Sequence, residues 1–281
     1  MALLYGLVTA MAFGIGDFLA GQATKRVPTL IVVLYAQLFG TAMMLPIALF
    51  SGHSISVTSG FWGLLGGVAI GIGFLYYFKA LATGKMGVVS SITGTLSALV
   101  PVLTGLILGE RPGTGALVAV AIIVIAILFI SKKEPETESL AGTSSKVLIQ
   151  AALAGFLIGL YFVFLHIPAE NESMWTVFFT MTGSFLAVLT VLFIRRANLL
   201  ERHLDGLGLI FGNGFLQAFG TITYILGVSI GLMSIVALAG ALSPLFTVLF
   251  ARLFIQEKLT RPQLIGVFLA LTGITLLVLY T

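Results

Sequence analysis

The chain carries a succession of ten apolar segments, each long enough to cross a lipid bilayer. A spanning helix needs about 20 mainly apolar residues, and such runs fill most of the 281 residues, joined mainly by very short connections. We therefore predict an all-α integral membrane protein with ten transmembrane helices. The predicted helices lie at roughly 3–23, 29–50, 60–83, 87–108, 113–131, 147–167, 173–194, 205–229, 232–254 and 262–280.

The composition excludes most other classes. Hydrophobic residues make up 59% of the chain and charged residues 9%, whereas a soluble domain carries about 25% charged residues. The net charge of +4 comes from basic residues scattered over short loops, so we expect no nucleic-acid partner. The chain has no cysteine, and its three histidines, His53, His166 and His203, lie far apart in sequence. We expect no metal site and no cofactor.

The second half of the chain repeats the first at a shift of 147 residues. We predict a first five-helix repeat over 1–131, a polar linker over 132–146 and a second five-helix repeat over 147–281. Because each repeat holds an odd number of spans, the two copies must be inverted relative to each other in the membrane. The matching pairs include Gly67 with Gly214, Gly73 with Gly220, Tyr77 with Tyr224, Gly84 with Gly231, and Glu110 with Glu257.

The loop charges support this count and predict an orientation. The first connection of copy one has Lys25 and Arg26, whereas its counterpart in copy two has Glu170 and Glu172 and no base. Basic residues mark cytoplasmic loops, so the odd-numbered loops are predicted to be cytoplasmic and both termini to be outside; Arg111 is the one base on the outer side. The bases on the inner side are Lys25, Arg26, Lys79, Lys85, Lys132, Lys133, Lys146, Arg195, Arg196, Arg202, Arg252, Lys258 and Arg261.

The end of each copy resembles a known family. The segment LSPLFTVLFARLFIQEKLTRPQLIGVFLALTGITLL contains Pro244, Glu257-Lys258, Gly266 and Gly273 in the order typical of the drug/metabolite transporter superfamily, in its ten-helix EamA-type branch. Copy one has a weaker version, LVPVLTGLILGERPGTGALV. The segment FGIGDFLAGQATKR is similar to a bacterial subgroup of this family. The resemblance covers nearly the whole chain.

Copy one departs from the family pattern in two ways. Pro101 stands nine residues before Glu110, whereas Pro244 stands thirteen before Glu257. Ala119 and Ala126 replace the two glycines of the last span. These departures affect the expected geometry of the fourth and fifth spans and leave the resemblance itself intact.

The resemblance implies a secondary transporter in the inner (plasma) membrane of a bacterium. We expect it to move a small polar metabolite, such as an amino acid or a related solute, by alternating access, with proton coupling as one option. Its expected partners are the substrate and the lipid bilayer; a monomer is favoured and a homodimer stays open. Familiar relatives have cytoplasmic termini, and the loop charges here indicate the reverse. An intramembrane enzyme and a channel-like protein are the alternatives, although the dispersed acidic residues do not favour magnesium chemistry.

Two charged residues lie inside predicted spans. Asp17, in AFGIGDFLAG, is the carboxylate that lies well within a span, and charges at such depth usually face a cavity or a partner. We expect it to take up a coupling proton or to contact a cationic substrate group, or else to pair with a helix end or a basic loop residue. Lys79 is expected to extend toward the cytoplasmic interface, or to act as a counter-charge for an anionic substrate or for Asp17.

The eighth span has the richest polar stripe. Successive spacings of four, four and three place Asn213, Gln217, Thr221 and Tyr224 on one helix face. Such a stripe either lines a binding site or makes hydrogen bonds between helices. Three further candidates for substrate binding lie near mid-depth, namely Gln37, Tyr76 and Tyr77. Glu110-Arg111 and Glu257-Lys258 are interpreted as local ion pairs at helix ends.

A reporter fused after Thr281 tests the predicted orientation. We expect a reporter that is active only outside the cytoplasm to be active in this fusion, because the loop charges place the C-terminus outside. Activity of a cytoplasm-specific reporter at the same position would contradict it.

Overall fold

The computed structural model describes residues 1–52, 54–83, 86–130, 144–168, 174–195, 206–256 and 260–280. Every regular element in these ranges is an α-helix, as the hydrophobic segments predict. The helices are α1 (Ala2–Ala23), α2 (Thr29–Phe50), α3 (Val57–Thr83), α4 (Met86–Ile107), α5 (Thr114–Ile130), α6 (Ser145–His166), α7 (Met174–Arg195), α8 (Leu207–Ser229), α9 (Met233–Gly240), α10 (Ser243–Phe254) and α11 (Arg261–Tyr280).

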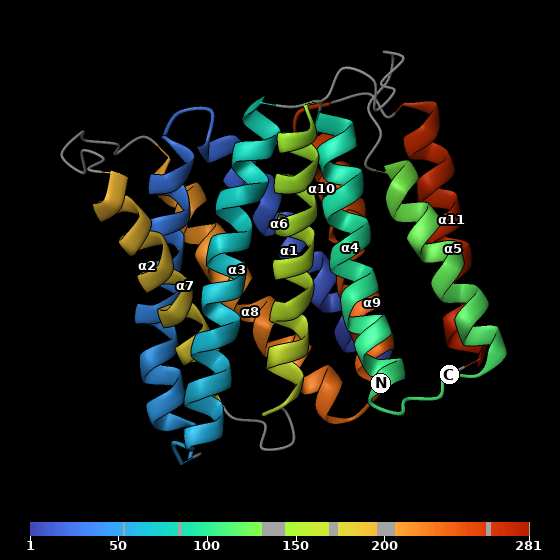
Figure 1. The fold of residues 1–281 in the computed structure, drawn as a ribbon, viewed down its shortest axis with the longest axis horizontal. Helices are drawn as coiled ribbons and strands as arrows, with labels where there is room; N and C mark the ends of the chain where they lie inside the picture. The colour runs from blue at the N-terminus through green and yellow to red at the C-terminus, as the bar shows by residue number, and fades with distance from the viewer. Residues whose placement is uncertain are drawn as a thin grey trace.

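The helices form a bundle suited to a bilayer. Within the described ranges, seven segments are long and apolar enough to cross a membrane, and three shorter apolar helices accompany them. These segments match the ten predicted spans. Figure 1 shows both ends of the chain at the same end of the bundle, as an even number of crossings requires. We call this end the terminal end, and the end at which α1 finishes the loop end.

The predicted span at 232–254 consists of two helices, so our expectation of one continuous helix is wrong here. α9 ends at Gly240, and α10 starts at Ser243 with Pro244 in its first turn. Proline lacks an N–H, and its ring collides with the carbonyl four residues earlier, here that of Gly240. The chain therefore turns at Ala241 and Leu242. Pro101 lies within α4 without dividing that helix.

Helices of the first half pack mainly against helices of the second half. α1 lies along α8, and α3 lies along α6 and α7. α2 lies between α7 and α8, and α4 contacts α6 and α9. α5 pairs with α11 at one edge of the bundle (Figure 1). The two halves are thus interleaved, and residues distant in sequence share one interior.

Matching glycines make matching close contacts in the two halves. A Cβ at Gly67 of α3 would collide with the Thr180 carbonyl of α7 and lie 2.9 Å from the Cα of Gly183. A Cβ at the equivalent Gly214 of α8 would collide with the Ala36 carbonyl of α2. Ala36 and Gly183 are themselves equivalent under the 147-residue shift. Because glycine has no side chain, these helix backbones approach closely enough for extensive dispersion contacts.

The backbones of α5 and α11 also approach closely, because glycines of α11 face small residues of α5. Gly266 lies against the backbone of Ala126 and Ile130, and Gly273 lies against Ile123 and Ala119. The order of these contacts makes the two helices antiparallel. Ala119 and Ala126 are fully buried, so the replacement of two glycines by alanines leaves this pair closely packed.

Gly67→Ala should destabilise the protein because an added methyl meets backbone atoms, which cannot move aside as a flexible side chain can. We expect a loss of about 1–3 kcal/mol, measured as a lower thermal unfolding temperature in detergent. Gly21→Ala is the matched control, since nothing lies within 4 Å of a Cβ built there. Equal stability of both variants would contradict the packing described here.

Candidate functional site

Asp17 lies on the inner side of α1 and is nevertheless accessible. At about 100° per residue, Phe13 and Gly14 lie within about 60° of Asp17 around the helix axis, and both are buried. Leu4 and Met11, which are 58% and 41% exposed, lie about 120° or more away. The apolar outer side of α1 therefore faces away from Asp17. The Asp17 side chain itself is exposed, although it points toward the interior of the bundle.

The polar stripe of α8 meets Asp17 across the contact between the two halves. The Gln217 side chain donates from Nε2 to Asp17 Oδ1 at 3.4 Å. A Cβ at Gly16 would lie 3.1 Å from Asn213 Oδ1, so the absence of a side chain at Gly16 brings the stripe against α1. Asn213 and Gln217 are 6% and 8% exposed. The predicted carboxylate is thus in contact with the first two residues of the predicted stripe.

Unpaired amide oxygens lie beside this contact. Gln37 Oε1 and Asn213 Oδ1 are buried without a hydrogen-bond partner among the described residues. Gln37 follows Ala36, whose carbonyl touches the position next to Asn213. Buried polar atoms are normally satisfied, so orphaned acceptors on the packed helices α2 and α8 are a reason to expect a ligand or a different hydrogen-bonding arrangement in another state.

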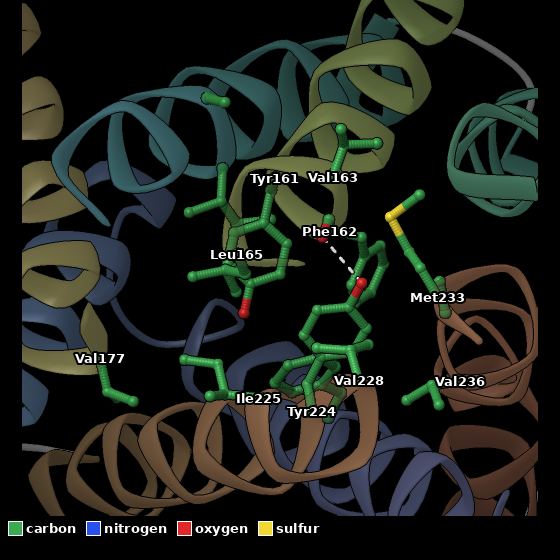
Figure 2. Packing of buried hydrophobic residues seen from close by; sticks show 14 of the residues in the cluster. Tyr161, Phe162, Val163, Leu165, Val177, Tyr224, Ile225, Val228, Met233 and Val236 are labelled. Atoms are coloured by element: carbon green, nitrogen blue, oxygen red, sulfur yellow. Dashed lines mark hydrogen bonds between the residues drawn. The ribbon is translucent and has the colours of Figure 1, made fainter. Parts of the chain in front are cut away.

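A layer of aromatic side chains seals the interior on the terminal side of Asp17. We define the aromatic layer as Phe13, Tyr161, Phe162 and Tyr224, all of them buried. Phe162 is central, with ring centroids 4.9 Å from Tyr224 and 5.1 Å from Tyr161, and 6.3 Å from Phe13. Figure 2 shows Tyr161, Phe162 and Tyr224 gathered between α6 and α8. The layer joins helices of both halves.

Hydrogen bonds fix the layer in place. Tyr224 donates its hydroxyl to the Phe162 carbonyl at 2.7 Å (Figure 2), and the hydroxyls of Tyr161 and Thr221 lie 2.8 Å apart. Closer to the terminal end, the hydroxyls of Thr9 and Thr223 also lie 2.8 Å apart. Each bond connects two different helices. Tyr224 therefore belongs to the aromatic layer and Thr221 is hydrogen-bonded to it, whereas Asn213 and Gln217 lie on the loop-end side of the layer.

The break between α9 and α10 touches the same region. Thr247 of α10 donates its hydroxyl to the Gly14 carbonyl at 2.9 Å, and a Cβ at Gly14 would collide with the Ser243 carbonyl. Phe18 packs against Phe250, with ring centroids 6.3 Å apart. The residues on either side of Asp17 are thus held against α10.

The remaining predicted residues lie elsewhere. Tyr77 packs against a small cluster that contains Ala80 and Val147, whereas Tyr224 belongs to the cluster around Phe162. The structure does not bring this repeat-related pair of tyrosines together. Tyr76 is half-buried on α3, and Lys79 is exposed near the C-terminal end of that helix.

Glu110 differs from our expectation of a local ion pair at a helix end. Its carboxylate accepts from the backbone N–H of Met233 at 2.6 Å and of Ser234 at 3.0 Å. These are the first two residues of α9, which has no cap from its own preceding residue. Orphan N–H groups at a helix start attract carboxylates. Glu257-Lys258 lies outside the described residues.

Sequence reasoning missed Tyr161 and Phe162. Tyr161 lies well inside a span, and a buried tyrosine hydroxyl needs a partner, so the argument applied to Tyr76 and Tyr77 would also have selected it. Phe162 carries no such signal, because one phenylalanine among 22 is not distinctive.

Comparison with known proteins agrees with this architecture. The model of the EamA-like transporter family matches residues 1–132 and 145–279. The chain belongs to the EamA-like transporter family. A protein of Archaeoglobus fulgidus described as an uncharacterized transporter is 22% identical over 286 residues, which cover 99% of this chain and 98% of the relative.

A solved structure shares the fold. A crystal structure of a protein superposes with a TM-score of 0.80 at 18% identity, over 99% of this chain and 96% of the other. The family and the apolar helices together define a multi-pass membrane transporter in a lipid bilayer, with a small molecule as its substrate. The family and the relative both point to a transporter rather than to an enzyme.

A double-mutant cycle on Tyr161→Phe and Thr221→Val tests the hydrogen bond between these two hydroxyls. We expect a coupling energy of about 0.6–2 kcal/mol, the range for hydrogen bonds between membrane helices. Both substitutions keep the side-chain shape, so unfolding measurements in detergent report the bond itself. Additive effects would show that the two hydroxyls do not interact.

Proposed function

We propose that this protein is a secondary transporter that moves a small polar metabolite, such as an amino acid or a related solute, by alternating access around Asp17. The observation that carries the proposal is the position of Asp17. It is an accessible carboxylate on the inner side of α1, bonded to Gln217 of the other half and bordered by a sealed aromatic layer. Charged groups at such depth generally serve ion or substrate pathways.

Asp17 takes up the coupling proton or contacts a cationic group of the substrate. No basic side chain pairs with it in the described part of the chain, where its hydrogen bond is to the neutral Gln217 amide. A carboxylate within a membrane-spanning helix is commonly neutralised by a proton or a cation. The unpaired oxygens of Gln37 and Asn213 add acceptors for N–H or O–H groups of a substrate.

Alternating access is supported by the way the halves interlock. Equivalent glycines make equivalent contacts, and the equivalent helices α5 and α11 run antiparallel, as expected for two inverted repeats over 1–131 and 147–281. Inverted repeats that meet at a mid-membrane site can exchange between two states related by a pseudo-two-fold axis in the membrane plane. We propose that the state described here is open to Asp17 from the loop end and closed at the terminal end by the aromatic layer, since Asp17 is exposed and the four layer residues are buried.

The loop charges favour a cytoplasmic position for the proposed open end. Lys25 and Arg26 are both exposed at the end of α1, and positive loops remain inside. We therefore propose an inward-facing state with both termini outside, in a bacterial inner membrane. Tyr76, Tyr77 and Lys79 on α3 are proposed as further contacts that a substrate meets on its way through the inner side.

The substrate is to be found by binding, and Asp17 is then tested by transport. A ligand of the folded state raises the unfolding temperature, so a thermal-shift screen against a metabolite library gives the substrate for counterflow in proteoliposomes. We expect Asp17→Asn to lower counterflow by about tenfold or more, because hydrogen bonds to charged groups contribute about 1.5–3 kcal/mol. Asp17→Glu should retain part of the rate.

The controls separate a carrier from other classes. Gly21→Ala, one turn from Asp17 on the same side of α1, should transport normally. Unchanged rate and unchanged response to a proton gradient in Asp17→Asn would remove Asp17 from the mechanism. Steady conductance in place of saturable exchange would make the protein a channel.

A further inference from the structure

Glu110 connects two helices of opposite halves at the closed end of the bundle. It follows α4, and its backbone N–H donates to the Gly105 carbonyl at 2.9 Å, which turns the chain back over that helix. A Cβ at Gly105 would collide with the Glu110 carboxylate and lie 3.3 Å from the Cβ of Ser234. The glycine therefore provides the space in which the carboxylate reaches α9.

Met233, one of the two residues from whose N–H groups Glu110 accepts, packs beside the aromatic layer. Met233 is fully buried and packs in the same cluster as Phe162 and Tyr224, as Figure 2 shows. Ala237, one turn further along α9, is also fully buried in that cluster. If the first turn of α9 moved away from α4, the face of α9 that carries these two residues would separate from the aromatic layer.

The break after Gly240 lets α9 move separately from α10. At Ala241 and Leu242 the regular α-helix gives way to a turn, in which the Leu242 N–H donates to the Ala239 carbonyl at 3.1 Å, and Pro244 has no N–H to donate to the Gly240 carbonyl. α10 is held against α1 next to Asp17 by the Thr247–Gly14 hydrogen bond. One half of the broken span therefore borders Asp17, and the other half is held by Glu110.

We propose that Glu110 is the latch of the outer gate: its carboxylate holds the start of α9 against α4 while the inner side is open, and it releases α9 when the transporter opens outward. The proposal rests on the alternating access proposed above and adds a gating role to a residue that lies outside the substrate site. The link is a strong one, because hydrogen bonds to a charged acceptor are about twice as strong as neutral ones.

Cysteine labelling tests the latch without any substrate. The chain contains no cysteine, so each introduced thiol is the single target of a membrane-impermeant maleimide. Ala237→Cys reports opening of the terminal end, and Gly21→Cys, at an exposed position with nothing within 4 Å, reports opening of the loop end. Vesicles of both orientations allow the reagent to be applied from either side.

We expect Glu110→Gln to raise the labelling rate of Ala237→Cys from the terminal side by about tenfold and to lower that of Gly21→Cys from the loop side, because a weaker latch shifts the population outward. Glu110→Asp, which keeps the charge but is shorter, should give an intermediate shift. Arg111→Gln removes the neighbouring exposed charge and should change neither rate.

Opposite changes at the two reporters distinguish gating from loosening. Unchanged labelling in Glu110→Gln would overturn the proposal, and so would faster labelling at both positions together with a lower unfolding temperature, since that pattern means a purely structural cap. The labelling assay uses no substrate and measures no transport. A negative result for Glu110 is therefore independent of the result of the Asp17 transport experiments.

Discussion

Close backbone contact between helices of opposite halves is the constraint on which the other features depend. In a bilayer, apolar side chains gain little by leaving lipid for protein, so helix association relies on dispersion contacts and hydrogen bonds. Gly67 against Thr180 and Gly214 against Ala36 allow those contacts to form. Since each contact joins the two halves, neither half has a complete interior of its own, and any site in the centre must draw on both.

The arrangement of polar groups follows from this interleaving. Gly16 lets α8 approach α1 closely enough for Gln217 to reach Asp17, and Asn213 then lies against the same stretch of α1. One turn away, Phe13 of α1 and Tyr224 of α8 meet Phe162 of α6 and close the interior. The same helix pair therefore supplies both an accessible carboxylate and the barrier beside it. The alternating access proposed above needs both features side by side, because solute would then reach Asp17 from one end only.

The discontinuity in the ninth span gives the two halves unequal roles. Pro244 divides α9 from α10, while Pro101 leaves α4 undivided. At the other end of α9 from this break, Glu110 accepts from the first two N–H groups of the helix. Residues that have no counterpart at the 147-residue shift, Asp17 and Pro244 among them, thus lie where the two halves of the chain differ in local structure.

Sequence by itself determined the all-helical class, nearly all span boundaries and the residues of the α8 stripe. The length and period of a hydrophobic segment are local properties, so they can be read from that segment alone without knowing which helix packs against it. Its GALSP segment also held the signal of the broken span, since Pro244 follows Gly240 at the spacing that removes a helix carbonyl's partner.

Only the tertiary structure decided which residues meet. In the structure, Asp17 contacts Gln217, and Tyr77 and Tyr224 lie in different clusters. Glu110 binds the start of α9 instead of forming a local ion pair. Such contacts depend on helix rotation and on how closely backbones approach, and these are set by the packing of small residues on both partners together. No single segment contains that information.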